Sequence, residues 1–458
     1  MIEPRINSRR NLFSLCLASF IIISGYSVIV PFLPIYANDF LTEFDLLGFT
    51  FGIGLQIGII AAGNLVMKLF LAPAYGDLSD ITGRKPIIVI GMAAYTLLMA
   101  GYGFASDFLS LFILRVLSGV ASAAVWPVGQ ALVADTASKE NIGKYLGFYM
   151  LSMMLGVTTG PFLAYGSFSV LTGTGFTEID SYRLTFVSVA VLGLVATLAV
   201  TFSVTDPVTE NKRLSKTSLY WESVKLMAVR TLRSPIFLYR TLSTAVDYRT
   251  RSVKTIYAVA IVNGFATALL VPIVPLVLEE YYLLDAGSIA LVIGIVGVLS
   301  ILGAPTGGVI SDQIGRKKTV WSSGFACGFV IFLLGFKTSI LLLVVIFALL
   351  RFLFTVMQPS FRALQSDLVP EEVRGKEFGI VDAAFNFGSV LGPVFGGYLY
   401  DLFYLAEYDL GYGLVFTGAG TAFAVSGLLL ILANLLLLLL VNQKQVITGD
   451  RAVKLVPN

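Results

Sequence analysis

Long apolar segments alternate with short polar segments along nearly the whole chain. A helix that crosses a lipid bilayer needs about 20 mostly apolar residues, because the hydrocarbon core is about 30 Å thick. The pattern therefore predicts an all-α integral membrane protein with twelve transmembrane helices. We place them at residues 12–36, 49–75, 86–105, 108–134, 145–170, 184–204, 255–278, 288–310, 319–336, 340–365, 377–400 and 411–441.

The composition agrees with this pattern and excludes two other classes of protein. Of the 458 residues, 57% are hydrophobic and only 13% are charged, against about 25% charged residues in a typical soluble domain. A soluble protein keeps a charged surface, and a disordered chain has low hydrophobicity. The chain is therefore neither an ordinary cytosolic enzyme nor a disordered protein.

Histidine is absent from the chain, and the two cysteines, Cys16 and Cys327, lie in separate apolar segments. The sequence therefore predicts no disulfide framework, no Cys/His metal site and no cofactor. It contains no nucleophile arrangement typical of an enzyme and no Walker-type phosphate loop. Any proton transfer must use carboxylates, because histidine is the side chain that ordinarily titrates near neutral pH.

Basic residues are distributed unequally between the two ends of the predicted helices. With the N-terminus inside, the inner segments hold 25 of the 31 Lys and Arg residues, and the outer loops hold two, Arg183 and Lys337. This distribution follows the positive-inside rule and, with twelve helices, predicts that both termini are cytoplasmic. The net charge of +3 thus conceals a steep difference between the two sides.

One long polar segment, residues 205–254, divides the predicted helices into two groups of six. It contains ten Lys and Arg residues and four Asp and Glu residues. We interpret it as a basic linker at the anionic inner leaflet, with a regulatory segment as the alternative. The predicted organisation is a six-helix bundle at 1–204, this linker, a second bundle at 255–441 and a cytoplasmic tail at 442–458.

The two groups of helices contain the same motif. Residues 76–85, GDLSDITGRK, recur 232 residues later as GVISDQIGRK at 308–317. The same offset pairs Pro127 with Pro359, Asp135 with Asp367, Gly156 with Gly388, and Gly160-Pro161 with Gly392-Pro393. Both copies of the motif lie on the predicted inner side, so the halves form a parallel repeat. That architecture is typical of transporters whose substrate binds near the midplane between the two halves.

These features resemble the major facilitator superfamily over nearly the whole chain. The segment after the second helix matches its signature loop at Gly76, Asp80, Gly83, Arg84 and Lys85. Arg115 with Gly119 resembles the family's helix-4 motif, and Gly156-x-x-x-Gly160-Pro161 resembles the helix-5 motif of its twelve-span drug–proton antiporters. The resemblance implies two six-helix bundles, transport by alternating access and a monomer.

The glycines and the proline of the fifth helix have two interpretations. Small residues let neighbouring helices approach closely, whereas proline opens a kink that could form the seal between the halves. The sequence leaves both open.

The resemblance also implies a cluster of charges, which we call the latch, at the inner ends of the second and fourth helices. Its members are Asp80, Arg84 and Asp135, and Asp312, Arg316 and Asp367 would repeat it in the second half. A latch stabilises one conformation and breaks in the other, as alternating access requires. The alternative is that the bases only anchor the topology.

Charged residues inside transmembrane helices are rare and mark candidate functional positions. Here they are Lys68, Arg115, Arg351, Arg362 and Asp382. Lys68 either reaches the inner interface or changes its charge during transport. Arg115 either acts in proton coupling or substrate contact, or snorkels to the outer surface. Arg351 should face the cavity or a carboxylate, and Arg362 should snorkel. Asp382 is either a proton carrier or a surface carboxylate near a helix N-terminus.

Four of these five charges are positive, which favours a positive cavity for anionic or zwitterionic substrates. The alternative is that the bases pair with carbonyl or interfacial groups. Polar and aromatic residues on the first, fourth, seventh, tenth and eleventh helices are candidates to line the cavity. They are Tyr26, Trp126, Gln130, Asn263, Gln358 and Asn386.

We therefore expect a secondary active transporter rather than an enzyme. The first hypothesis is proton-coupled efflux of small amphiphilic compounds. The second is a proton-independent exchanger or uptake carrier for an organic anion or sugar-like solute, and the third is a transporter-like sensor. The expected partners are a small-molecule substrate, a proton or other coupling ion, and the lipids of the plasma membrane, with no nucleic acid.

Overall fold

The structure, a computed structural model, describes residues 8–46, 48–137, 141–206, 251–369, 374–403, 406–412 and 414–442. Most of the predicted basic linker and all but the first residue of the predicted tail therefore lie outside the described residues. The chain forms two compact units. Unit 1 comprises Met1–Leu41, Gly63–Phe237 and Leu283–Gly294, and unit 2 comprises Thr42–Ala62, Leu238–Tyr282 and Ile295–Asn458.

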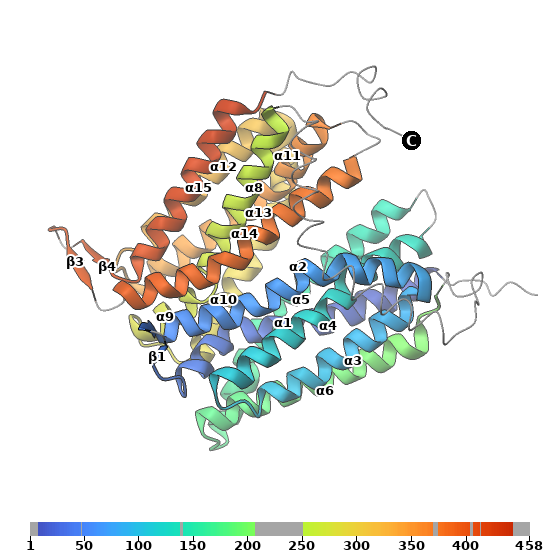
Figure 1. The fold of residues 1–458 in the computed structure, drawn as a ribbon, viewed down its shortest axis with the longest axis horizontal. Helices are drawn as coiled ribbons and strands as arrows, with labels where there is room; N and C mark the ends of the chain where they lie inside the picture. Colours follow the sequence, from blue (N-terminus) through green and yellow to red (C-terminus); the bar gives the residue numbers. More distant parts are fainter. Residues whose placement is uncertain are drawn as a thin grey trace, which may run out of the picture. The chain divides into compact units, whose positions relative to one another are not determined.

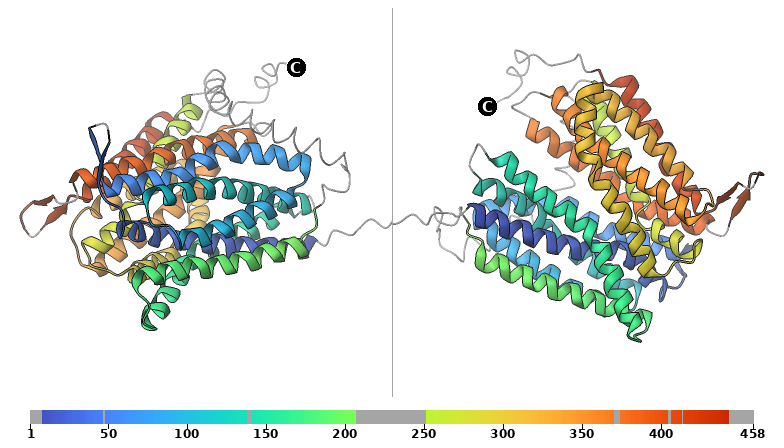
Figure 2. Two further views of the ribbon diagram at one scale, coloured as in Figure 1. Left: turned by 60° about the horizontal axis from the view of Figure 1, so that its bottom comes forward. Right: turned by 180° about the vertical axis from the view of Figure 1, so that it is seen from behind.

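Unit 1 is built from the helices drawn in blue to green in Figure 1. They are α1 (Ser8–Asn38), α2 (Ile53–Thr82), α3 (Arg84–Tyr102), α4 (Phe108–Thr136), α5 (Ile142–Gly173) and α6 (Glu178–Ser203). Helix α1 packs between α5 and α6, and α3 packs against α4 and α6 (Figure 2). The first ten residues of α2 belong to unit 2.

Unit 2 repeats these pairings with the helices drawn in green to red. They are α8 (Arg251–Leu269), α9 (Ile273–Glu280), α10 (Ala286–Ile301), α11 (Gly303–Ile314), α12 (Arg316–Leu333), α13 (Ile340–Leu368), α14 (Arg374–Phe403) and α15 (Gly420–Leu440). The first nine residues of α10 belong to unit 1. Helix α8 packs against α14 and α15, and α12 packs against α13 and α15. The internal repeat seen in the sequence is therefore also a repeat of helix packing.

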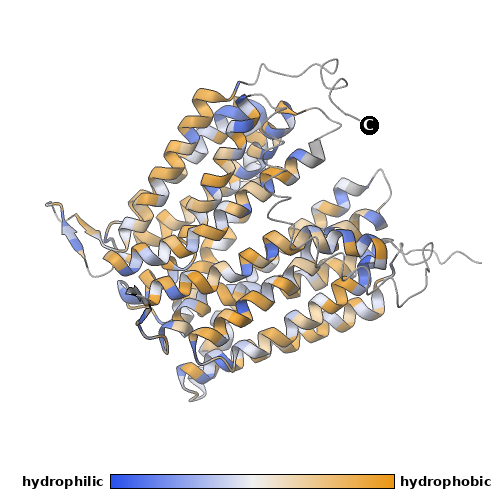
Figure 3. Cartoon of the chain, in the orientation of Figure 1, coloured by the Kyte–Doolittle hydropathy of each residue, from blue (hydrophilic) through white to orange (hydrophobic). Residues whose placement is uncertain are grey.

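Eleven helical segments of the described chain are long and apolar enough to cross a membrane. Hydrophobic residues predominate along the helices, as Figure 3 shows. Two of the segments, Arg251–Glu280 and Ala286–Ile314, each contain two helices joined end to end, α8 with α9 and α10 with α11. The remaining predicted span, 319–336, is the ninth along the chain and overlaps α12, whose first three residues are all basic and leave too short an apolar stretch.

Two short β-hairpins, which the sequence interpretation did not include, precede helices of this otherwise helical fold. Strands β1 (Phe44–Leu46) and β2 (Phe49–Phe51) pair antiparallel, as do β3 (Glu407–Asp409) and β4 (Val415–Thr417). The second and twelfth spans therefore begin later than predicted, at Ile53 and Gly420. Aromatic residues such as Phe51 and Phe416 add to an apolar count, but they also favour strands, and hydropathy cannot separate the two.

The duplicated motif is a sharp break between two helices rather than an extended loop. Gly83 alone separates α2 from α3, and Gly315 alone separates α11 from α12. Their φ angles are 94° and 98°, a region that side chains with a Cβ rarely adopt. Gly83 therefore permits a tight helix end, whereas Gly76, the other glycine of the first copy, lies inside α2.

The helix-5 glycines lie where α5 and α1 touch. A Cβ atom on Gly156 would come within 2.8 Å of the Phe20 carbonyl oxygen, and one on Gly160 within 2.4 Å of the Ser24 carbonyl oxygen. The contact is part of unit 1, and α5 continues unbroken through Pro161. Close packing, one of the two interpretations of this motif, therefore has a direct geometric basis.

Candidate functional site

Three helices of unit 1 bring two basic residues onto aromatic rings. The Lys68 ammonium of α2 lies 3.7 Å from the ring centroid of Trp126 on α4 and 4.7 Å from that of Tyr26 on α1. The Arg115 guanidinium carbon lies 5.7 Å from the Tyr26 ring centroid. All three distances are within the range of cation–π attraction. We call these four residues, with Tyr95, the cationic cluster.

The aromatic rings of the cluster hold one another in place. Tyr26 packs edge-on against Trp126, with ring centroids 5.2 Å apart, and lies 6.4 Å from Tyr95. Such edge-to-face pairs place the positive ring edge against the negative ring face. The packing of α1 against α4 therefore fixes the orientation of the two ring faces on which the Lys68 ammonium lies.

A backbone contact between α2 and α4 positions Arg115 beside Lys68. Gly119 lies one turn after Arg115, and a Cβ atom there would be only 2.6 Å from the Asn64 carbonyl oxygen. Asn64, one turn before Lys68, donates to the Ser118 hydroxyl at 3.1 Å. The glycine of the Arg-x-x-x-Gly motif thus lets the two helices approach until both bases face the same rings.

The cluster has many hydrogen-bond donors without acceptors. Arg115 is only 6% exposed, and its Nε and Nη1 atoms have no partner among the described residues. The same holds for Trp126 Nε1 and the Tyr95 hydroxyl. Within that part of the chain, no carboxylate forms an ion pair with Lys68 or Arg115. Because buried polar groups are normally paired, the cluster is suited to an anionic group supplied from outside the chain.

The geometry corrects two of the sequence-based alternatives. Arg115 does not snorkel to the outer surface, because its guanidinium is buried beside Tyr26. Lys68 does not extend to the inner interface, because its ammonium lies on the Trp126 ring. The Tyr26 and Trp126 rings attract cations, so the Lys68 and Arg115 side chains are stabilised when they point toward these rings and not toward the membrane surface.

The charges predicted within the helices of unit 2 are arranged differently. Arg362 of α13 pairs with Asp382 of α14, and both side chains are about half exposed, at 42% and 52%. Arg362 therefore has a carboxylate partner where snorkelling was expected. Asp382, for which a proton carrier and a surface carboxylate were the two predicted alternatives, is about half exposed and paired. Arg351 is partly buried and forms no ion pair with any described residue, so the expected carboxylate is not found there.

The other cavity-lining candidates do not form one cluster. Gln130 lies 3.9 Å from the Met150 sulfur. Asn263 is 3% exposed, and its Oδ1 has no partner among the described residues. Gln358 is partly exposed and Asn386 exposed. Of the six candidates, the structure brings only Tyr26 and Trp126 into direct contact with the intramembrane charges.

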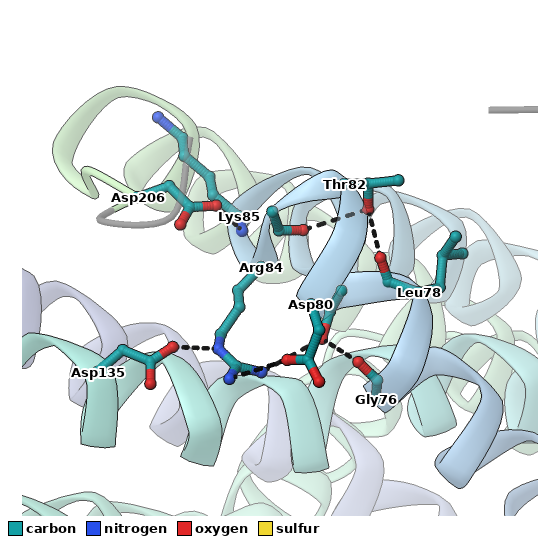
Figure 4. A network of polar contacts seen from close by, with 10 residues as sticks. Gly76, Leu78, Asp80, Thr82, Arg84, Lys85, Asp135 and Asp206 are labelled. Atoms are coloured by element: carbon teal, nitrogen blue, oxygen red, sulfur yellow. Dashed lines mark hydrogen bonds and ion pairs between the residues drawn. The ribbon is translucent and has the colours of Figure 1, made fainter. Parts of the chain in front are cut away.

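The first copy of the latch is assembled in unit 1 (Figure 4). Arg84 pairs with Asp80 at 3.1 Å and with Asp135, and it also donates to the Ser79 hydroxyl at 3.3 Å. The guanidinium is 15% exposed, so the pairs are shielded from water on one side. The backbone N–H of Lys85 donates to Asp206 at 2.8 Å, which fixes the start of α3.

The second copy is incomplete. Arg316 of α12 pairs with Asp367 of α13 and donates to the Ala363 carbonyl at 3.3 Å. Asp312 is exposed and forms neither an ion pair nor a side-chain hydrogen bond with the described residues. The expectation that Asp312 joins this cluster is therefore wrong. Arg316 turns toward α13 instead, where it binds two acceptors.

Two buried polar contacts of unit 2 were missed by the sequence interpretation. Glu377, 5% exposed in the first turn of α14, accepts a hydrogen bond from the Tyr257 hydroxyl of α8. Asp401 near the end of α14 accepts the backbone N–H groups of Gly54 and Leu55, both at 2.7 Å. Both acids lie at the margins of an apolar segment, where acids are usually solvated. Only the helix packing reveals that they are bound.

Comparisons with known proteins give a consistent picture. The model of the Major Facilitator Superfamily matches residues 15–247 and 256–454. The multi-drug resistance efflux pump PmrA of Streptococcus pneumoniae is 26% identical over 400 residues, covering 85% of this chain and 89% of PmrA. The multidrug resistance protein MdtG of Proteus mirabilis is 25% identical over 420 residues, covering 87% of this chain and 91% of MdtG.

A solved structure has the same fold. It is a bacterial homologue of the human lysosomal transporter Spinster, with a TM-score of 0.72 and 14% sequence identity. The similarity covers 96% of this chain and 98% of that one.

Proposed function

The chain belongs to the Major Facilitator Superfamily, and from this premise we propose that it exports small amphiphilic compounds that carry a negative charge. It is a multi-pass transporter of the plasma membrane, close to the drug-efflux group, and not an enzyme. The proposal concerns the chemical class of the substrate, the direction of transport and the coupling of transport to protons. Relatives named as multidrug efflux proteins support export.

The cationic cluster is the observation that carries the proposal. Two bases lie against aromatic rings with no acidic partner among the described residues, and Arg115 has two unpaired donor atoms. A carboxylate, sulfonate or phosphate would accept these donors, and a planar guanidinium can bind such a group through two hydrogen bonds. Trp126 and Tyr26 would contact the apolar part of an amphiphile.

Flux measurements with matched probes test this proposal. The purified protein is reconstituted in vesicles with an imposed pH gradient, and an alkylbenzenesulfonate is compared with an alkyltrimethylanilinium of the same chain length. We expect flux of the anion, and a rise of about tenfold or more in KM for Lys68→Gln, because a hydrogen bond to a charged group contributes roughly 1.5–3 kcal/mol. Lys337→Gln is the matched control, since Lys337 is an exposed base paired with Glu407 at 3.0 Å. Transport of the cation with no response to the anion would refute the proposal.

Proton coupling is the second part of the proposal. The Arg362–Asp382 pair joins α13 to α14, and both side chains are about half exposed, so loss of the charge on Asp382 would release Arg362. Under this proposal Asp382→Asn abolishes flux driven by a pH gradient but leaves downhill exchange. Uphill flux retained in the variant would remove Asp382 from the coupling path.

A proton-independent exchanger of organic anions is the second candidate function. The observation that favours it is the same lack of an acidic partner for Lys68 and Arg115 among the described residues. An exchanger needs only that an anion on either side can bind the cluster. Equal rates of anion exchange with and without a pH gradient would decide for this candidate.

We also propose that the latch of unit 1 stabilises one of the two conformations of the transport cycle. Arg84 binds two carboxylates from the ends of α2 and α4 in a partly shielded position. Such a pair has two discrete states, formed and broken, as a conformational switch requires. A residue that only anchors the topology would need no carboxylates.

A further inference from the structure

A groove of about 540 Å³ runs between α1 and α5 at their N-terminal ends. Its polar end is formed by Arg9, Asn141 and Lys144, and mostly apolar residues on both helices, with Ser152 among them, form the rest of its wall. The groove belongs to unit 1 alone and does not include the cationic cluster. No role in transport assigned above involves it.

The two bases at the polar end are available to a ligand. Arg9 and Lys144 are both exposed, and neither forms an ion pair with a described residue. They come from the starts of two helices that run in the same direction from this end, so both charges lie at one mouth of the groove. An anionic group placed there would contact both bases at the depth of the lipid head groups.

The rest of the groove is mostly apolar and long enough for part of an acyl chain. Phe13 is 69% exposed, Phe148 48% and Leu155 40%. From Lys144 to Leu155 the helix rises about 16 Å, at 1.5 Å per residue. One end of the groove therefore suits a charged head group, and the remainder suits a hydrocarbon tail.

The internal repeat provides a comparison within the same chain. Leu12, Cys16 and Tyr145 line the groove of unit 1. Tyr145 corresponds to Glu377 at the offset of 232, and the first helices of the two halves, aligned by the Pro-x-x-Pro motifs that begin at Pro31 and Pro272, pair Leu12 with Val253 and Cys16 with Tyr257. Those counterparts line a hole of only about 10 Å³ in unit 2. The larger Tyr257 side chain and its hydrogen bond to Glu377 fill the space there.

The open groove is therefore a property of the first-half sequence and not of the helix packing that both halves share. The counterpart of Lys144 at the offset of 232 is Lys376, so the two halves share this base and differ in the open space beside it. The difference in volume favours a ligand in unit 1, and the two bases at the mouth of the groove favour an anionic one.

We propose that this groove binds one phospholipid with an anionic head group from the inner leaflet of the membrane. Arg9 and Lys144 bind the head-group phosphate, and one acyl chain lies along Phe13, Phe148 and Leu155. The orientation agrees with the predicted cytoplasmic N-terminus. The bound lipid would contact α1 and α5 between their N-terminal ends and their glycine contact.

Native mass spectrometry of the full-length protein tests the proposal. The detergent-solubilised protein is titrated with phosphatidylglycerol and with phosphatidylcholine of the same acyl chains. We expect one phosphatidylglycerol to bind more tightly than phosphatidylcholine. Each of Arg9→Gln and Lys144→Gln should weaken that binding about fivefold, because a base near an anionic lipid contributes about 1 kcal/mol.

Two further variants keep the test decisive. Lys254→Gln is the matched control, since Lys254 is an exposed base that lines neither the groove nor its counterpart, and it should not change binding. Cys16→Phe should fill the groove and lower binding of both lipids while the protein stays folded by its elution profile. Equal affinity for the two lipids, or unchanged affinity in the Arg9/Lys144 double variant, would overturn the proposal.

Discussion

The contact between α1 and α5 allows a quantitative test through Gly160→Ala. The new Cβ atom would lie 2.4 Å from the Ser24 carbonyl oxygen and 2.5 Å from Ser27 Cβ. Carbon atoms pack best at about 3.5–4.0 Å, so α1 and α5 must separate by roughly 1 Å. The obstacles are backbone and Cβ atoms, which cannot rotate away.

The separation would also break a hydrogen bond that the motif requires. Pro161 has no N–H group, so the Val157 carbonyl one turn earlier lacks its helical partner. The Ser27 hydroxyl of α1 donates to that carbonyl at 2.7 Å. Overpacking costs about 1–3 kcal/mol, and loss of the hydrogen bond adds about 0.5–1.5 kcal/mol. We therefore expect Gly160→Ala to destabilise the protein by roughly 2–4 kcal/mol.

Thermal unfolding in detergent, followed by scanning fluorimetry, measures the effect. A loss of this size should lower the apparent Tm by roughly 5–10 °C for a unit of about 200 residues. Gly166→Ala is the matched control. Gly166 lies on the same helix, and a Cβ atom there would meet nothing within 4 Å. Alanine has the higher helix propensity, so the control should be neutral or slightly more stable. If the two variants have the same Tm, packing is not the reason for glycine at position 160.

Three further contacts give predictions of the same kind. Asp135→Asn weakens the Arg84 latch and should shift the population of inward-open and outward-open states. Distance measurements between spin labels would show this shift, and unchanged distances would refute the latch. Asp401→Asn leaves one good acceptor for two backbone N–H groups of α2 and should cost about 1–2 kcal/mol, visible as a lower apparent Tm. Tyr257→Phe removes a donor from the buried Glu377 carboxylate and should cost about 1–3 kcal/mol. An unchanged Tm in either variant would mean that the contact is not formed.

The helical fold and its repeat could be predicted because the bilayer imposes strict rules on sequence. Backbone groups in lipid must bond within a helix, and each crossing needs about 20 apolar residues. The β-hairpins could not be predicted in this way, because the rule does not apply to the ends of the apolar segments. Residues 411–419 are uncharged, yet Val415–Thr417 form a strand that precedes α15.

The cationic cluster could be predicted in part. Lys68 and Arg115 stand out in the sequence because a charge in an apolar segment is costly and rare. Their partnership with Tyr26 and Trp126 could not be derived, because it depends on the close approach that Gly119 allows between α2 and α4.

The acids of unit 2 show the opposite situation. Asp382 stands out in the sequence because it lies inside a predicted span, whereas Glu377 and Asp401 lie at the ends of that span and do not. In the structure Asp382 is about half exposed, while Glu377 and Asp401 accept hydrogen bonds from other helical segments. The position of a residue along a transmembrane helix predicts its depth in the membrane. Whether its side chain is buried depends on which side of the helix packs against a neighbouring helix.

The most direct test of the central claim, that the cationic cluster binds the anionic group of a substrate, uses Trp126 as its own reporter. Replacing Trp221 and Trp321 by Phe leaves Trp126 as the only one of three tryptophans. Its fluorescence is then recorded while an alkylbenzenesulfonate or the matched alkyltrimethylanilinium is added to the purified protein. We predict a saturable change with the anion that Lys68→Gln weakens about tenfold, and none with the cation. Saturation by the cation, or no response to the anion, would contradict the account.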